Sequence, residues 1–553
     1  MILFGSFIWS LTMVKSGLIY SYGIGFWGPN GHDGIWHLSL ITGLARGSFG
    51  MPIFAGELIK NYHIGFDLLV AVLHLISDLP VSFLYFQILP PLLALGVGWS
   101  VMGFLKAWKK DDRAIRWGLF FTYFGGSFGW LVSLIRNGQT GGESMFWSQQ
   151  SISTLLNPPF ALSLIIVFFS LTSLLKYQRH PTKTAWLISV ILFGFLLEIK
   201  VYAGILALGS LLVISVYEFL TEKKTGLLRI FLGSLVISLI IFLPFNRNSQ
   251  SLIVLRPGWF LETMLIYSDR FYWPRLYHTI VDSRQLHNWP KSLLGYFLAL
   301  FIFLIGNLGT RVLALIAVIK NRKPDIVSLF IYSFIFGGLL LPMLFLQKGT
   351  PWNTIQFFYY SQIFLGILAA LFISGLFGRL NHHKYFRYAI WLLIIIVTIP
   401  TTLDTLDHYL PSRPPAMISK DELQALNKLA SLPPGNVFTY PIQPDAYYPP
   451  PRPLYYYDST AYVSAYSGHP VFMEDTVNLN ITGFDWPRRQ AQSEEFIAMQ
   501  NINQAREFLH QNRIKYIYLA LVAKYRPFLT ASQLGGKIIF ENSQASIWQV
   551  DTN

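Results

Sequence analysis

The chain contains no cysteine in its 553 residues. This absence excludes disulfide bonds, a thiol nucleophile and any metal site built on cysteine. Charged residues are also scarce, at 13%, whereas 53% of the residues are hydrophobic. Many of these form long runs, such as AIWLLIIIVTIP at 389–400, that are apolar on every face of a helix. The composition therefore excludes an ordinary soluble protein and predicts a polytopic α-helical membrane protein.

Eleven segments are predicted to span the membrane. They lie near residues 3–22, 81–105, 117–135, 158–175, 185–199, 201–220, 230–245, 293–319, 326–346, 353–377 and 388–408. Residues 64–77 are also apolar, but the segment is short and contains Asp67 and His74. We therefore expect it to form a helix on the outer membrane interface rather than a span.

Basic residues in the short links predict the orientation of the chain. The links are net basic, which is typical of the cytoplasmic side; they are 106–116, 176–184, 221–229, 320–325 and 378–387. They agree with one another only if the N-terminus is cytoplasmic and the C-terminus lies outside the plasma membrane. Residues 23–80 and 246–292 then form outer loops. Basic cytoplasmic links also account for the net charge of +14 without a nucleic-acid partner. The first apolar segment has no basic region before it and is expected to be retained as a span.

The character of the sequence changes after residue 408. Proline, tyrosine and charged residues become frequent, so 1–408 is predicted to be the transmembrane domain and 409–553 an extracytoplasmic domain. Helical periodicity occurs at 421–433 and 501–512. Short β-rich runs occur at 436–441, 515–521, 537–542 and 546–550. A soluble α/β domain is the simplest fold for this pattern.

The stretch GHDGIWHLSLITGLARG, 31–47, carries the first candidate site. Asp33 and His37 are four residues apart, so on a helix both side chains point the same way. Together they could bind a divalent cation such as Mg²⁺ or Mn²⁺, or hold a base in one tautomer. Alternatively, Asp33 is simply the N-cap of the following helix.

Further polar residues follow in the same loop. His63 with Asp67, and His74 with Asp78, repeat the four-residue spacing; the alternative is an ordinary wet face of an interfacial helix. Glu57 is a candidate second carboxylate, and Asn61 is a candidate hydrogen-bond donor to a sugar or phosphate. For both positions, a solvated loop residue is the more common explanation.

The second outer loop is unusually basic for its side of the membrane. Residues 246–292 contain six Lys and Arg against three Asp and Glu. Guanidinium groups suit phosphate oxygens, so Arg256, Arg270 and Arg275 are candidate phosphate ligands, together with Lys348 of the short turn 347–353. Attraction of this loop to anionic lipid headgroups is the alternative.

These features together resemble the GT-C superfamily of integral-membrane glycosyltransferases, which use polyprenyl-phosphate-linked sugar donors. The likeness is to the branch similar to protein O-mannosyltransferases and aminoarabinose transferases. HDGIWHLSLITGLARG, followed by PIFAGELIKNYHIGFDLLVAVLHLI and the second span, resembles the opening of many members. The resemblance covers the whole chain as architecture and is specific over residues 31–80.

The resemblance implies an inverting transfer of a sugar to an extracytoplasmic lipid, glycan or protein. It assigns the catalytic carboxylate to Asp33. Where relatives usually have two adjacent acidic residues, this chain has His32 and Asp33, so the second role is left to His32, His37 or Glu57. His32, Asn61 and His63 are the predicted substrate-binding residues of the loop. The family includes metal-dependent and metal-independent members.

Two other classes of function are compatible with the sequence. A lipid or glycan transporter or flippase would also have many spans, but should carry charges near the middle of several spans and often inverted repeats. A non-catalytic envelope protein would use its outer domain to bind glycans. Replacement of Asp33 by Asn separates these classes from the enzyme.

Overall fold

The computed structural model describes residues 1–247, 252–380, 383–440, 448–457, 460–521 and 526–550. Small parts of the predicted link 378–387, loop 246–292 and strand 436–441 lie outside the described residues. Within them, eight helical segments are long and apolar enough to cross a membrane. They are Val81–Ala107, Pro158–Arg179, Val201–Glu222, Gly226–Asn246, Trp289–Lys320, Ile326–Leu344, Pro351–Arg379 and Lys384–Tyr409. The chain is thus an integral multi-pass membrane protein, as predicted.

A ninth crossing results if α6 (Asp112–Phe124) and α7 (Gly129–Asn137), which meet at 47°, form one broken span. Helix α9 (Lys183–Ile199) has 17 residues and is shorter than each of the eight segments. It nevertheless packs along α8 (Pro158–Arg179) and α11 (Gly226–Asn246). The number of eleven spans therefore stays a prediction.

The first predicted span, 3–22, needs correction. Helix α1 covers only Ile2–Ser10, and the chain then forms turns that lead into strand β1 (Ile19–Tyr20). The Ser16 hydroxyl oxygen accepts hydrogen bonds from the Trp27 backbone N–H at 2.9 Å and from Asn30 Nδ2 at 3.0 Å. These bonds tie the turn to the segment that precedes His32. Hydroxyl side chains at this end of the run thus replace a continuing helix with an anchored loop.

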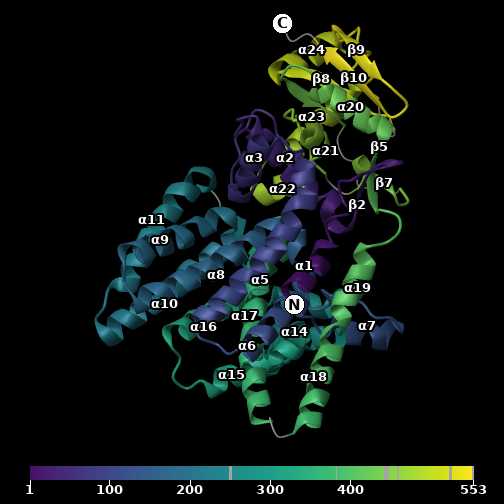
Figure 1. The fold of residues 1–553 in the computed structure, drawn as a ribbon. Coiled ribbons are helices and arrows are strands. Elements are labelled where there is room, and N and C mark those ends of the chain that lie inside the picture. The colour runs from purple at the N-terminus through teal and green to yellow at the C-terminus, as the bar shows by residue number, and fades with distance from the viewer. Residues whose placement is uncertain (248–251, 381–382, 441–447, 458–459, 522–525, 551–553) are drawn as a thin grey trace.

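The membrane bundle is built around α17 (Gln356–Arg379), which packs against α6, α15 and α16 and is buried on nearly all sides. Figure 1 shows α8, α9, α10 and α11 on one side of it and α18 and α19 as a separate column on the other. The remaining helices of the bundle are α4 (Val81–Phe83), α5 (Leu89–Ala107), α10 (Val201–Glu222), α12 (Trp259–Ile266), α13 (Pro274–Gln285), α14 (Trp289–Leu308), α15 (Leu313–Lys320), α16 (Ile326–Leu344), α18 (Lys384–Thr398) and α19 (Pro400–Tyr409). Two short strands, β3 (Ile253–Leu255) and β4 (Phe345–Gln347), pair between outer turns.

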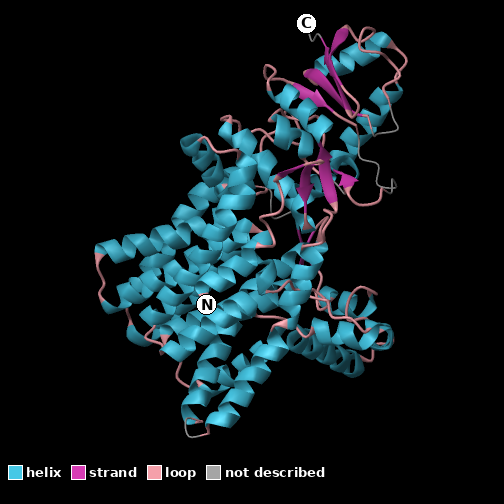
Figure 2. Cartoon of the chain, turned by 45° about the vertical axis from the view of Figure 1, so that its right-hand side comes forward, coloured by secondary structure: helices cyan, strands magenta, loops and turns pink. Residues whose placement is uncertain are grey.

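The region after residue 409 forms a four-stranded sheet and several helices at the far end of the molecule (Figure 2). The sheet order is β6-β8-β10-β9, with β6 (Asn436–Phe438) parallel to β8 (Ile514–Ala520) and the hairpin β9 (Gly536–Glu541) and β10 (Ala545–Val550) antiparallel. Helices α20 (Lys420–Ala430) and α24 (Ile502–Gln511) match the predicted helical segments. Helices α21 (Tyr462–Ser467), α22 (Thr476–Thr482) and α23 (Trp486–Ala498) complete the region.

The first outer loop and this C-terminal region share one sheet. Its order is β1-β2-β5-β7, and β2 (Gly23–Phe26) pairs antiparallel with β5 (Ala416–Ser419). Strand β1 (Ile19–Tyr20) and the parallel strand β7 (Arg452–Pro453) lie at its edges. The two predicted helices of the loop are present as α2 (Asp33–Ala45) and α3 (Gly65–Ser77), and α2 packs against α21. Residues of the loop and residues beyond 409 therefore form one body, which we call the outer body after its predicted side of the membrane.

Candidate functional site

The HD motif lies at the start of α2, immediately after a short 3₁₀ turn at Gly28–Gly31. Two flanking glycines allow close packing here. A Cβ on Gly31 would lie 2.7 Å from the Tyr457 ring, and a Cβ on Gly34 would lie 2.7 Å from Phe86 Cζ. Only glycine fits at these distances. The motif is therefore held between a wall from the C-terminal region and a wall from the membrane bundle.

A cavity of about 760 Å³ opens beside Asp33. It is lined by the loop before α2, the loop before α8, the start of α17, and residues of the C-terminal region. The polar side chains among them are His32, Asp33, Gln149, Gln150, Ser151, Ser153, Thr154, Asn157, Arg311, Thr350, Asn353, Gln356, Tyr359, Gln362, Arg452, Tyr455, Tyr456, Thr476 and Asn478. The size is within the range of small-molecule sites.

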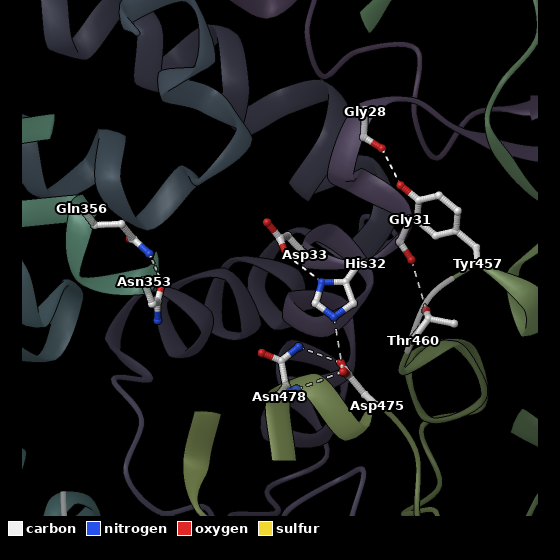
Figure 3. A network of polar contacts seen from close by, with 10 residues as sticks. All are labelled: Gly28, Gly31, His32, Asp33, Asn353, Gln356, Tyr457, Thr460, Asp475 and Asn478. Carbon is white, nitrogen blue, oxygen red and sulfur yellow. Dashed lines mark hydrogen bonds and ion pairs between the residues drawn. The ribbon is translucent and has the colours of Figure 1, made fainter. Parts of the chain in front are cut away.

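The imidazole of His32 lies between two carboxylates (Figure 3). Its Nδ1 is 2.8 Å from Asp33 Oδ1, and its Nε2 is 3.3 Å from Asp475 Oδ1. The Asp475 side chain is fully buried, whereas 49% of the Asp33 side chain is exposed. Asp33 is thus the carboxylate that a ligand in the cavity can reach.

The flanking carboxylates favour the protonated imidazole of His32, and that positive charge favours the ionised carboxylate of Asp33. Burial lowers the pKa of His32, but the two flanking carboxylates more than reverse this, so the pKa lies well above its usual range. Burial raises the pKa of Asp33, and the hydrogen bond and charge of His32, together with the charges of His37 and Lys200, lower it by more. At neutral pH Asp33 is therefore a carboxylate able to accept a proton or hydrogen bond.

Asp33 is not a helix cap. The N-cap position of α2 belongs to His32, whose side chain makes no capping bond, and Asp33 is the first helical residue. The recorded side-chain partner of Asp33 is His32. Its negative charge still complements the N-terminus of α2, which favours ionisation further.

The four-residue spacing predicted that His37 and Asp33 act together, but the two side chains have different partners. Its Nδ1 lies 2.7 Å from Oδ1 of Asp67 on α3, and both side chains are buried. Behind this pair, the ammonium of Lys200 donates to Asn157 Oδ1 at 3.2 Å, and Asn157 lines the cavity. The charges of His37 and Lys200 both lower the pKa of Asp33.

The predicted His and Asp stripe on α3 is not formed. His63 precedes the first residue of α3, so the four-residue helical spacing to Asp67 does not apply. His74 Nδ1 faces the Leu79 carbonyl at 2.7 Å, and Asp78 is the left-handed C-cap residue. His63 is buried near Lys200 and His37, whose charges lower its pKa after the larger effect of burial.

Glu57 and Asn61 lie away from the cavity. Glu57 is exposed. Asn61 donates to the Thr482 carbonyl at 2.8 Å and so ties the outer loop to the C-terminal region. Neither is among the residues that line the cavity. Their catalytic and substrate-binding roles stay predictions, and the structure places both residues outside the cavity wall.

The four predicted phosphate ligands are also absent from the cavity wall. Arg256 lies 3.8 Å from Glu262, and Arg270 donates to the Ser144 carbonyl at 3.0 Å while stacking on a tryptophan. Arg275 and Lys348 are exposed. Carboxylate and carbonyl groups near the loop therefore satisfy part of its positive charge.

A basic residue that the sequence reasoning missed lines the cavity instead. Arg311 lies in the 3₁₀ turn Gly309–Val312 after α14 and is 1% exposed. Its Nε and Nη2 donate to backbone carbonyls and Gln150, and within the described residues no carboxylate lies within 4.0 Å and no hydrogen bond of Nη1 is recorded. A charge inside the predicted span 293–319 was the available signal.

The described residues contain no group of three His, Asp or Glu side chains that could hold a metal ion. Of the expected ligands, Asp33 lines the cavity, whereas His37 is not among its lining residues and its Nδ1 is held by Asp67. This is the arrangement in which metal-bound histidines are usually oriented. Mg²⁺ commonly uses one or two carboxylates together with substrate phosphates. The donor set is therefore compatible with a cation shared with a substrate.

No family model matches the chain, and no curated protein does. Solved structures do resemble it. The oligosaccharyltransferase AglB from Archaeoglobus fulgidus, in complex with an inhibitory peptide and a dolichol-phosphate, superposes with a TM-score of 0.52 at 11% identity over 94% of this chain and 69% of that chain. Arabinofuranosyltransferase AftD from mycobacteria gives 0.52 at 13% identity over 100% of this chain and 40% of that chain.

The chain has the GT-C fold. This confirms the architecture that the sequence resemblance implied. A further AglB structure, in complex with Zn and sulfate, has a TM-score of 0.50 at 13% identity over 94% of this chain and 68% of that chain. At these identities the likeness establishes the fold alone, and the chemistry has to be argued from the cavity itself.

Proposed function

We propose that the chain is an inverting membrane glycosyltransferase. It moves a sugar from a polyprenyl-phosphate-linked donor to a hydroxyl acceptor on the outer side of the membrane. The observation that carries the proposal is the half-exposed carboxylate of Asp33 at the wall of a polar cavity that joins the membrane bundle to the outer body. AglB, which has this fold, is described in complex with a dolichol-phosphate.

Asp33 supplies the base. The acceptor oxygen attacks the anomeric carbon while its proton passes to Asp33, and the bond from that carbon to the phosphate oxygen breaks. The electron pair leaves with the polyprenyl phosphate. A single displacement of this kind inverts the anomeric configuration. Neither His32 nor Asp67 needs to touch the sugar for this step.

Arg311 is the group that suits the departing phosphate. Its guanidinium is buried, faces the cavity and is not neutralised by a carboxylate among the described residues. An uncompensated charge in a buried site is costly, and an anionic ligand would offset that cost. Bidentate donors also match phosphate oxygens. This assignment replaces the arginines of loop 246–292.

Neutral amides suit the sugar hydroxyls. Asn353 and Gln356 lie on one side of the cavity, hydrogen-bonded to each other, and Asn478 lies near Asp475 (Figure 3). Tyr455 and Tyr456 add aromatic faces from the C-terminal region. Amide groups both donate and accept hydrogen bonds, as a sugar hydroxyl requires. The acceptor is a lipid, a glycan or a protein.

A divalent cation remains part of the hypothesis. When bound, Mg²⁺ or Mn²⁺ would neutralise negative charge on the donor phosphate. In that case Asp33 and His37 would hold the cation, with Asp67 orienting the histidine ring, as an alternative to the role of Asp33 as the base. Binding of Mn²⁺ can be followed by electron paramagnetic resonance, and Asp33→Asn should weaken it at least tenfold. Unchanged Mn²⁺ binding in that variant would remove Asp33 as a ligand.

The orientation follows from the same proposal. The donor headgroup lies at the outer surface, so the cavity, loop 23–80 and the domain at 409–553 are extracytoplasmic and the N-terminus is cytoplasmic. The basic links support this arrangement. The chain contains no cysteine, so the orientation can be tested with single cysteines. One is placed in a link and another in the C-terminal region, and each is labelled from one side of the membrane.

The enzymatic test uses the full chain in lipid nanodiscs. Undecaprenyl-phosphate and dolichyl-phosphate donors carrying neutral pentoses or hexoses are supplied with membrane extract as acceptor, and released polyprenyl phosphate is measured by mass spectrometry. The native protein should release it, and Asp33→Asn should reduce the rate at least 100-fold, the typical contribution of a general base. Asp282→Asn, at an exposed position on α13, is the matched control and should not change it.

Two results would overturn the proposal. One is the absence of release with every donor, and the other is native activity of Asp33→Asn. Movement of an intact polyprenyl-phosphate sugar across the bilayer, without cleavage, would favour the transporter instead. Glycan binding without either reaction would favour the non-catalytic envelope protein.

A further inference from the structure

Three contacts from the C-terminal region hold the segment immediately before Asp33. The Tyr457 hydroxyl donates to the Gly28 carbonyl at 2.9 Å, and the Thr460 hydroxyl donates to the Gly31 carbonyl at 3.1 Å. Asp475 lies 3.3 Å from the ring of the next residue, His32. The partners are more than 400 residues apart in sequence, so the outer body brings them together (Figure 3).

Asp475 is built into the protein as a fixed carboxylate. Its side chain is fully buried and caps α22, where Oδ1 accepts from the Asn478 backbone N–H at 3.1 Å. Oδ2 accepts from Asn478 Nδ2 at 2.7 Å. These two bonds fix the direction of the carboxylate. The remaining face of Oδ1 meets His32 Nε2, so the charge of Asp475 acts on the histidine ring.

His32 passes this constraint to Asp33. One ring nitrogen faces Asp475 and the other is bonded to Asp33 Oδ1. Asp33 is otherwise half exposed, and within the described part of the chain no second hydrogen-bond partner of its carboxylate is recorded. Without the ring, the carboxylate would be free to adopt other rotamers. With it, Asp33 Oδ2 is left for a ligand in the cavity.

We propose that Asp475 is a positioning residue that holds the His32 ring against Asp33 and thereby fixes the direction of the Asp33 carboxylate. This inference rests on the proposed function of Asp33. It gives the C-terminal region a direct part in the reaction: the site is complete only when this region is seated on the first outer loop. Asp475 itself does not touch the acceptor or the donor.

The test is a double-mutant cycle on donor turnover. Asp475→Asn removes the charge and keeps an oxygen for the capping bond from the Asn478 backbone N–H, because Asn is as good an N-cap as Asp, although its amide nitrogen cannot accept from Asn478 Nδ2. His32→Phe keeps a ring and removes both nitrogens. Each single variant should lower kcat about 10–100-fold and change KM less than threefold, since misplacement of a reacting group by about 1 Å costs this much. The double variant should be no slower than the slower single variant.

Asp325→Asn provides a matched control. Asp325 caps α16 by accepting from the Ser328 backbone N–H at 2.7 Å, in the link 320–325. The same substitution there should leave kcat unchanged. Asp475→Glu restores the charge and should recover part of the rate lost in Asp475→Asn. A merely structural role would lower the melting temperature of both Asp475 variants without this difference in kcat.

The outcomes separate this inference from the proposed function. Native kcat in Asp475→Asn, together with an inactive Asp33→Asn, would overturn the positioning role and leave the glycosyltransferase proposal standing. Multiplicative effects of the two single variants would also overturn it, because they would show that Asp475 and His32 act independently. Unchanged turnover in Asp33→Asn would instead overturn the proposed function.

Discussion

Asp67 on α3 accepts a hydrogen bond from His37 on α2 in the interior of the outer loop, with 2.7 Å between Nδ1 and Oδ1. The two interfacial helices are thus joined by a buried polar pair one helical turn beyond Asp33, which lines the cavity. The pair fixes the tautomer of His37, because a carboxylate can only accept. It also explains why both helices can carry polar residues on buried faces.

Replacement of Asp67 by Ala should destabilise the protein. The variant leaves the buried Nδ1–H of His37 without an acceptor, which costs about 1–3 kcal/mol. Asp282→Ala, at an exposed position, should stay within about 0.5 kcal/mol of the native value. Thermal unfolding in detergent micelles measures both. An unchanged midpoint for Asp67→Ala would show that the pair does not support α2.

Stability should fall as pH rises through the neutral range. The buried carboxyl of Glu474 accepts from the Val463 and Ser464 backbone N–H groups, and burial raises its pKa from 4.5 to about 8. Burial likewise raises the pKa of Glu422 to about 7. Each group binds its proton more tightly in the folded state than in the unfolded state. Folding therefore takes up protons between pH 4.5 and about 8, and stability is lost across that window.

Glu474→Gln should flatten this pH dependence. The amide cannot ionise, so the variant loses the share of the slope that Glu474 contributes, a few kcal/mol at about 1.4 kcal/mol per pKa unit. The measurement is the difference between the melting midpoints at pH 5 and pH 9 for each protein. The amide also leaves one backbone N–H unpaired, but it does so at both pH values, so this loss cancels in the difference. Parallel curves for the native protein and the variant would contradict the prediction.

Local features of the fold could be predicted from the sequence. The β-rich runs that became β8, β9 and β10 and the helix α24 have strict local periodicity, so their formation requires no knowledge of distant residues. The same is true of α3, whose length excluded a full span. Asp33 was found because an acidic residue beside an apolar run is costly and needs a reason.

Long-range relationships could not be predicted from one sequence. Nothing in residues 23–26 indicates pairing with 416–419, and nothing in Asp475 indicates His32 as its neighbour. The stripe on α3 was wrong for a local reason, because His63 lies outside the helix to which the spacing was applied. Arg311 carried a usable signal as a charge within a span, but its contact with the cavity depends on the folded bundle.

The spacing around the HD motif gives a steric prediction. Gly34→Ala places a Cβ 2.7 Å from Phe86 Cζ and should destabilise the protein by about 1–3 kcal/mol through overpacking. Gly43→Ala on the same helix is the control. Its Cβ would have no heavy atom within 4 Å, so it should be neutral or stabilising by up to about 1 kcal/mol.

Compensation tests the cause. Phe86→Leu removes the ring edge that the new methyl group meets, so Gly34→Ala with Phe86→Leu should be less destabilised than the two single variants added together. Melting curves of the four proteins give the coupling. Simple additivity would mean that the loss in Gly34→Ala arises from something other than Phe86.

Arg311 should contribute to binding of the phosphate of a polyprenyl ligand and should not contribute to binding of its hydrocarbon chain. Arg311→Met removes a buried guanidinium from the cavity, and loss of a charge-assisted hydrogen bond should weaken undecaprenyl phosphate binding about 10–100-fold. Binding of undecaprenol, which lacks the phosphate, should not change. Arg270→Met is the control, because Arg270 donates to Ser144 outside the cavity wall. Native mass spectrometry of protein released from nanodiscs measures the binding of both lipids to the native protein, to Arg311→Met and to Arg270→Met. Equal weakening of the two lipids by Arg311→Met would mean that Arg311 supports the bundle through its carbonyl contacts, and the phosphate would then need another cation.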